Sequence, residues 1–395
     1  MVAPEREGAQ GAPLRSRRSG AAPAELPAPG PARVRAACGR ALTSRSDSVR
    51  RKVALLREVL ERRGFASAAL TTRRNFAWLT DGGDAHVAGA TDESVAAIVV
   101  TAREVHVVTT VIEAGRLADE ELADTDLAVE SVPWPDGLQT HLRDLSAPVA
   151  HDADIEAELR HVRARLTAEE EERLVWLGAR AARAVTDAFL ATRPGDLETV
   201  VAERMALRLA DDGVNAPVLL VASDERIARY RHPLPKPKRV ERTLLLVLCA
   251  EWRGLYAALT RQGALRGSFD ADTRRRFAAA RQIEVAFNDA TIPGRTLGEV
   301  FAIGIEAYRT AGYADEWRLH HQGGTIAYRG REILGTPDER EGVDPGMAFA
   351  WNPSLTGAKV EDTLLLRRDG PRAFVTRDES WPLDASGGPA LWDDR

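Results

Sequence analysis

Three histidines are the side chains of this sequence best suited to proton transfer or metal binding. His320 and His321 are adjacent in "HHQGG", and His232 lies in the proline-rich stretch "RYRHPLPKP". A histidine changes its protonation near neutral pH because its unperturbed pKa is about 6.5, and its neutral ring is a common metal ligand. The pattern therefore indicates either a metal site or a proton-transfer site.

Charged residues follow the histidines along the chain. Arg331 and Glu332 come after a glycine in "YRGRE", and they fit either a substrate contact or a surface turn. Glu361 precedes the apolar run "TLLL", where a carboxylate is costly without a partner. We therefore expect Glu361 to belong to a functional site. An arginine binds a carboxylate through two parallel hydrogen bonds, so a carboxylate-bearing ligand suits this set.

The first half of the chain predicts a mixed α/β domain over residues 48–165. A helix begins at Asp47 or Ser48, which can cap it, and ends at Gly64. A strand and a turn follow at 67–80, and two β-branched runs over 93–110 predict two strands around a turn. The remaining pattern alternates between helix and strand, with a helix at 111–122, a strand at 126–134 and a helix at 136–145.

The second half repeats one order of elements. Two helices at 167–195 and 197–214 precede a strand at 217–223 and a strand pair at 242–261, which turns near Arg253 and Gly254. Two more helices at 268–290 and 296–313 precede strand-like segments at 347–355 and 360–368. This order predicts an internal α/β duplication. We place this domain at residues 166–383, with a tail at 384–395.

Composition narrows the class of protein. The 395 residues carry a formal net charge of −5, which does not favour nucleic-acid binding, and no apolar run approaches the length of a membrane span. Cys38 and Cys249 lie far apart, so two free thiols in a reducing, cytoplasmic compartment are the simpler reading than one disulfide. Residues 1–47 are rich in Ala, Pro and Arg and predict a disordered extension.

Four segments carry a resemblance to a known family: "RRNFAWLTDGG", "TRPGDLETVVA", "TIPGRTLGEVF" and "VDPGMAFAWNPSLTGAKVEDTLLL". In this order and spacing the chain resembles the creatinase/aminopeptidase superfamily, in its prolidase and creatinase branch. The resemblance implies an α/β fold in which a creatinase-type N-terminal domain precedes a duplicated pita-bread domain. It also implies a homodimer whose cleft is completed by the partner, and a dinuclear metal site with five ligands.

This sequence departs from that ligand set. The resemblance puts the five ligands at Val247, Ala258, Gly324, Asn352 and Glu361, of which only Glu361 keeps a ligand side chain. Two divalent cations close together need several anionic ligands to offset their repulsion. We therefore predict no dinuclear metal site and no cofactor. A single metal ion held by histidines and Glu361 stays an alternative.

Creatinase, which the resemblance includes, hydrolyses a C–N bond without metal. By analogy we predict a metal-independent hydrolase or lyase that cleaves a C–N or amide bond in a small carboxylate-bearing molecule. His232 is the expected acid/base, with a pKa raised by a nearby carboxylate, and Glu361 positions water or a cationic nitrogen. Strand alternation sends His320 and His321 to opposite faces, and we expect His321 in the cleft because it lies closer to the two glycines.

The other expected contacts of the substrate are Arg331, His320, Arg261, Asn352, Glu332 and Arg74. Arg261 is also placed to pair with Glu361, and Arg73 and Arg74 are placed to reach across a dimer, as the resemblance implies. A second hypothesis is a catalytically silent pita-bread protein that binds a peptide or a partner. Domains of this fold without metals provide its precedent.

Overall fold

The computed structural model describes residues 44–143, 145 and 148–393. The predicted extension at 1–47 lies outside these residues up to position 43, as does Cys38. Helix α1 (Arg45–Arg63) begins inside that prediction. Its N-cap is Ser44, whose side chain accepts from the Asp47 amide, so the predicted caps Asp47 and Ser48 are wrong. Gly64 ends the helix with a φ of 73°, as predicted.

The first sheet has five strands in the order β4-β3-β2-β1-β5. Its three central strands, β1, β2 and β3, are antiparallel, and the edge strands β5 and β4 run parallel to β1 and β3, respectively. The turn predicted after β1 is the short helix α2, since residues 73–79 follow the strand as one helical segment. The bounds are β1 Ser67–Thr72, α2 Arg73–Leu79, β2 Glu93–Thr101, β3 Val105–Thr110, α3 Ala114–Arg116, β4 Ala128–Val132, α4 Leu138–Leu142, β5 Val149–His151 and α5 Asp152–Arg163.

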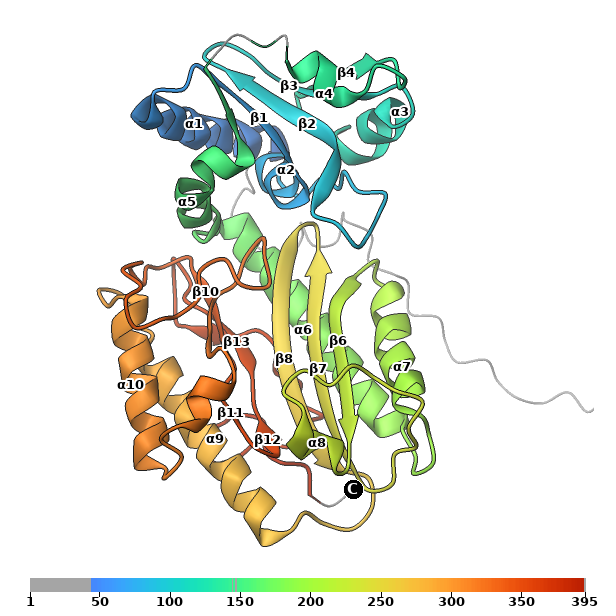
Figure 1. Ribbon diagram of the computed structural model, residues 1–395, viewed down its shortest axis with the longest axis vertical. Coiled ribbons are helices and arrows are strands. Elements are labelled where there is room, and N and C mark those ends of the chain that lie inside the picture. The colour runs from blue at the N-terminus through green and yellow to red at the C-terminus, as the bar shows by residue number, and fades with distance from the viewer. Residues whose placement is uncertain (1–43, 144, 146–147, 394–395) are drawn as a thin grey trace, which may run out of the picture. The chain divides into compact units, whose positions relative to one another are not determined.

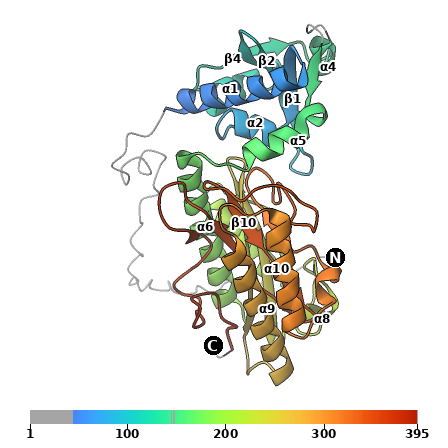
Figure 2. The same cartoon turned by 90° about the vertical axis from the view of Figure 1, so that its left-hand side faces the viewer.

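The second part of the chain shows the predicted repeated order. Helices α6 (Ala168–Ala191) and α7 (Glu198–Ala210) precede three antiparallel strands, β6 (Asn215–Ser223), β7 (Thr243–Trp252) and β8 (Leu255–Ala264). Helices α9 (Ala271–Ala290) and α10 (Leu297–Thr310) precede a second sheet in the order β14-β13-β10-β9. Both views show α9 and α10 side by side (Figure 1 and Figure 2).

Capping explains where two of these helices begin. Thr167 and Glu170 form a reciprocal capping box at α6, and Thr296 and Glu299 form the same arrangement at α10. The remaining elements are short: α8 Arg226–Arg229, β9 Gly323–Thr325, β10 Ala348–Trp351, β11 Ser354–Leu355, β12 Ala358–Lys359, β13 Asp362–Leu365 and β14 Ala373–Phe374.

One face of the hairpin formed by β7 and β8 lies beneath the site, and we call this face the platform. Arg253 and Gly254 turn it with φ angles of 50° and 79°, in the left-handed region that a two-residue hairpin turn requires. Alternation sends Leu244, Leu246 and Leu248 into the apolar core that α6 covers. The other face carries 247, 249 and 251 on β7 and 256, 258 and 260 on β8, because Val247 pairs with Thr260 and Cys249 with Ala258.

Buried ion pairs join the first sheet to the second part of the chain. The Lys52 ammonium lies 2.6 Å from carboxylates of both Asp81 and Glu170. Arg163, at the end of α5, lies 2.9 Å from Glu332. These contacts hold the two parts at defined points near α1 and α6. The predicted boundary at residue 165 lies between α5 and α6.

Two further features concern the ends and the surface. Trp392, in the predicted tail, packs on Phe189 and Trp381 with ring centroids 5.0 Å apart. Within the described ranges, none of the helices has the length and apolar character to cross a membrane.

Candidate functional site

The three histidines lie together. The Nε2 atoms of His232 and His320 are 2.9 Å apart, and the rings of His320 and His321 stack with centroids 4.4 Å apart. His232 comes from the loop between α8 and β7, and the other two follow the 3-10 turn Glu316–Leu319. The predicted alternation is wrong, since residues 320 and 321 precede β9 rather than lie in it. Both rings therefore join one cluster.

Burial and positive neighbours keep these imidazoles neutral. Burial, followed by the positive charge of Lys359, lowers the pKa of His320 to about 2. Burial, followed by Arg331, lowers the pKa of His321 to about 4. The pKa of His232 is also lowered by burial and by Lys359, with Glu361 acting in the opposite direction. The expected upward shift at His232 is therefore wrong, because desolvation and cations outweigh the carboxylate.

Glu361 lies beside this cluster on the platform. It is 2% exposed, and its two carboxylate oxygens accept from Arg331 Nη2 at 2.5 Å and from Thr260 Oγ1 at 2.9 Å. The backbone amide of Thr260 donates to the Glu361 carbonyl at 3.0 Å, which fixes residue 361 against β8. The Nε of Arg331 is buried without a partner. Arg331 and Glu361 thus form a fixed, nearly buried ion pair at the edge of the histidine cluster.

Lys359 is a member of the site that the sequence did not reveal. It is 4% exposed, two residues before Glu361, and its charge acts on His232, His320 and His321. Burial and Arg331 lower the pKa of its ammonium group, against the attraction of Glu361. Cys249 is buried beside Arg331, and burial raises the pKa of its thiol to about 11, which agrees with the small buried hydrophobe that we expect. The positive charges of Lys359 and Arg331 favour an anionic ligand.

The positions that the resemblance assigns to metal ligands do not fit a dinuclear metal site. Val247 packs in an apolar cluster with Leu220, Ala222, Ile227 and Leu245. Gly324 has a φ of 149°, and a Cβ there would lie 2.1 Å from a backbone oxygen, so no larger residue fits. Ala258 has no donor atom, and Asn352 offers one buried, unpartnered amide oxygen.

The remaining predicted contacts lie in other places. Arg261 points away from the cleft and pairs with Asp362 at 2.7 Å, because strand alternation sends it to the opposite face from Thr260. It also donates to the backbone carbonyl of Glu361, but it forms no ion pair with that side chain, so the predicted pairing is wrong. Glu332 is held by Arg163 in a buried ion pair, which excludes a surface turn for this residue.

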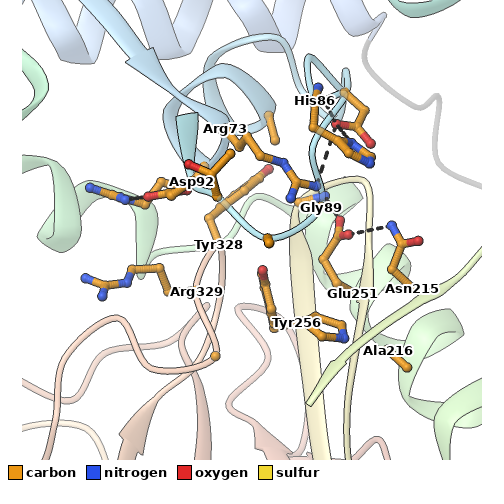
Figure 3. A pocket seen from close by; sticks show the side chains of 18 of the residues that line it. Arg73, His86, Gly89, Asp92, Asn215, Ala216, Glu251, Tyr256, Tyr328 and Arg329 are labelled. Atoms are coloured by element: carbon orange, nitrogen blue, oxygen red, sulfur yellow. Dashed lines mark hydrogen bonds and ion pairs between the residues drawn. The ribbon is translucent and has the colours of Figure 1, made fainter. Parts of the chain in front are cut away.

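Figure 3 shows a cavity of about 500 Å³, and Arg74 is one of the residues that line it. Arg74 is paired with Asp92 and Glu156. The cavity also contains Glu251 and Tyr256, which lie on the same face of the hairpin as Cys249 and Thr260. Glu251 accepts from Asn215 Nδ2 at 2.8 Å. The hairpin face that carries Cys249 and Thr260 therefore continues into this cavity.

Comparison with known proteins agrees with this architecture. Residues 176–368 match the sequence model of metallopeptidase family M24. The fold is similar to prolidase from Pyrococcus furiosus, with a TM-score of 0.67 and 18% identity over 82% of this chain and 99% of that one. It is also similar to the dipeptidase PepE from Mycobacterium ulcerans, with a TM-score of 0.69 and 20% identity over 88% of this chain and 98% of that one. Residues 176–368 thus carry the sequence signature of metallopeptidase family M24, and the fold is the pita-bread fold of these structures.

The family match is to peptidase-like hydrolases and covers residues 176–368, and the structural match is to proteins with the pita-bread fold. The N-terminal domain of the FACT subunit SPT16 from chickpea also shares the fold, with a TM-score of 0.65 and 13% identity over 85% of this chain and 97% of that one. No curated protein matches the sequence. The predicted family and fold class are confirmed, and the chemistry has to be argued from the site.

Proposed function

We propose that this member of the superfamily hydrolyses a C–N bond in a small carboxylate-bearing molecule without a metal ion. The observation that carries the proposal is the cluster of His232, His320 and His321 beside the Arg331–Glu361 pair. Imidazoles whose pKa is lowered are bases at neutral pH. The cations next to them, Lys359 and Arg331, favour an anionic substrate and disfavour a divalent cation.

In this proposal a neutral imidazole removes a proton from water as the water oxygen attacks the carbon of the C–N bond. His232 takes this role because it is exposed at the cluster and its Nε2 lies 2.9 Å from His320. The protonated ring then returns the proton to the leaving nitrogen. Glu361 stabilises that cation, and the positive charge of Arg331 attracts the carboxylate of the substrate.

A mononuclear metal enzyme is the second candidate, and one observation favours it. The ligand atoms of the three histidines all lie within 4.8 Å of one another, and neutral imidazoles are good zinc ligands. The positive charges of Lys359 and Arg331 disfavour this second candidate. They would repel a bound metal cation, just as they disfavour the protonated, cationic form of the histidines.

The metal content of the purified full chain and its activity before and after chelation separate the two candidates. The assay follows a panel of dipeptides, N-acyl amino acids and guanidino acids by mass spectrometry. We expect turnover that is unchanged by chelation and lost in His232→Ala, while the control His151→Ala, at an exposed histidine, keeps it. Stoichiometric metal whose removal abolishes turnover overturns the metal-free proposal. Full turnover by His232→Ala overturns the acid/base role.

The homodimer and the cytoplasmic location stay predictions of the sequence. Light scattering on the purified chain tests the first. A monomer that turns over substrate at full rate contradicts a cleft completed by a partner subunit.

A further inference from the structure

The cavity of Figure 3 is lined by helix α2, by the loop that follows this helix, and by the hairpin of β7 and β8. Its volume of about 500 Å³ is in the range of small-molecule sites. None of the described residues that line it belongs to the histidine cluster or to the Arg331–Glu361 pair. The cavity is therefore a second candidate site for a ligand, and its charged side chains indicate which ligand it fits.

Glu251 is a buried carboxylate without a cationic partner in this cavity. It is 7% exposed, and its oxygens accept from the Asn215 side chain at 2.8 Å and from the Gly254 amide at 2.7 Å. Both donors are neutral, and over the described ranges no ion pair reaches this carboxylate. A buried charge is costly unless an opposite charge compensates it. Glu251 therefore leaves a negative charge that a cationic group of a ligand can match.

Arg73 is the complementary group, and it reaches the cavity from α2. Within the described part of the chain its guanidinium makes no hydrogen bond, and its Nη2 lies 3.9 Å from the nearest carboxylate oxygen, which belongs to Asp84. Asp84 is itself hydrogen-bonded to His86 at 2.6 Å, whereas the neighbouring Arg74 is paired with two carboxylates. Because an arginine binds a carboxylate through two parallel hydrogen bonds, Arg73 suits the carboxylate of a ligand.

Tyr256 adds a neutral hydrogen-bond donor to these two charges. Its hydroxyl has no partner among the described residues, and Figure 3 shows the side chain directed into the cavity. Burial, followed by the negative charge of Glu251, raises the pKa of this hydroxyl to about 12, so it keeps its proton at neutral pH. Since Arg73, Glu251 and Tyr256 line one cavity, one small ligand can contact all three.

We propose that this cavity binds a free α-amino acid with an apolar side chain. Arg73 and Tyr256 donate to its carboxylate, and Glu251 accepts from its ammonium group. An anion alone is repelled by Glu251 and a cation alone by Arg73, so the cavity selects a molecule that carries both charges. The apolar side chain packs on small residues of the wall, which are Ala77, Ala90, Ala216 and Pro217. This binding goes beyond C–N hydrolysis and does not require that activity.

Isothermal titration calorimetry of the purified full chain at pH 7 tests the proposal. The probes are alanine, valine, leucine and phenylalanine, each with the two analogues that lack its amine or its carboxylate; for leucine these are 4-methylpentanoate and 3-methylbutylamine. We expect at least one amino acid to bind and both of its singly charged analogues to bind at least about tenfold more weakly. No binding by any of the four, or an analogue as tight as its parent, overturns the proposal. Tighter binding of leucylleucine than of leucine overturns the assignment to a free amino acid.

Substitutions test whether the amino acid occupies this cavity. Arg73→Gln and Glu251→Gln are each expected to weaken its binding at least about tenfold, whereas the control Arg103→Gln, at an exposed arginine, leaves binding unchanged. His232→Ala is expected to bind the amino acid as the unaltered chain does, because the histidine cluster is not part of the cavity. Unchanged affinity in Arg73→Gln, or loss of binding in His232→Ala, overturns the proposal.

Two features of this design keep the result interpretable. If Glu251→Gln does not fold, Arg73→Gln and the singly charged analogues on the unaltered chain still decide. Binding is measured without turnover, so a failed hydrolase assay leaves the amino-acid site standing, and failed binding leaves metal-free hydrolysis untouched.

Discussion

Acidification is expected to destabilise the folded chain through His320. This histidine is 9% exposed, and burial with the positive charge of Lys359 lowers the pKa of its ring to about 2. The same ring has a pKa near 6.5 in an unfolded chain, so the unfolded state binds the proton that the folded state refuses. The folded pKa lies below the unfolded one, so stability falls as the pH drops below 6.5. Linkage gives a loss of about 2 kcal/mol from His320 between pH 7 and pH 5.

Urea unfolding of the chain and of His320→Asn at pH 5, 6 and 7 measures the contribution of His320 to the pH dependence of the free energy of unfolding. The substitution removes the titrating ring, so the variant is expected to lose about 2 kcal/mol less than the unaltered chain over this interval. His232 and His321 remain in both proteins, so their contributions cancel in the comparison. His151→Asn controls for the removal of a surface histidine. Equal pH slopes in the chain and in His320→Asn refute the reasoning.

Substitutions at three positions test the packing around the site. Arg163→Met is expected to cost roughly 3–5 kcal/mol in urea unfolding because it leaves the Glu332 carboxylate buried and unpaired, and an unchanged midpoint contradicts this. Arg331→Met is expected to cost a similar amount through Glu361, roughly 3–5 kcal/mol, whereas Arg331→Lys recovers part of it. Gly324→His is expected to lower the melting temperature and to add no zinc binding by calorimetry, since its Cβ meets the backbone at 2.1 Å; stoichiometric zinc would contradict the steric argument.

The sequence predicts the fold well because local signals and global order agree. Helix α6 has an N-cap, an acidic first turn and an apolar face, and the hairpin of β7 and β8 has a left-handed turn at Arg253 and Gly254. Helix boundaries were harder to predict where several nearby residues can serve as the N-cap. The N-cap of α1 is Ser44, and not Asp47 or Ser48. The helix α2 follows β1 in a segment whose basic and aromatic residues gave no helical period.

The site was predictable only in part, for a physical reason. A histidine is a candidate for proton transfer or metal binding wherever it occurs, so His232, His320 and His321 could be named from the sequence. The structure brings the three together. The ion-pair partner of a charged residue cannot be predicted from the sequence in this way. Glu332 and Glu361 were both candidates for the site, yet Glu332 forms a structural ion pair with Arg163, which comes from a helix far away in the sequence. Lys359 could have been noticed as one of four lysines, but its burial depends on tertiary packing.

The charges of the cleft connect these observations. Where the superfamily resemblance implies anionic ligands for two cations, this chain has apolar or neutral residues at four positions and keeps one carboxylate, Glu361. That carboxylate is already matched by Arg331, so the additional buried cation, Lys359, has no counter-charge of its own. Loss of the ammonium proton or binding of an anionic substrate relieves this imbalance. A divalent cation would add to the imbalance. The electrostatics therefore favour organic anions as ligands of this cleft.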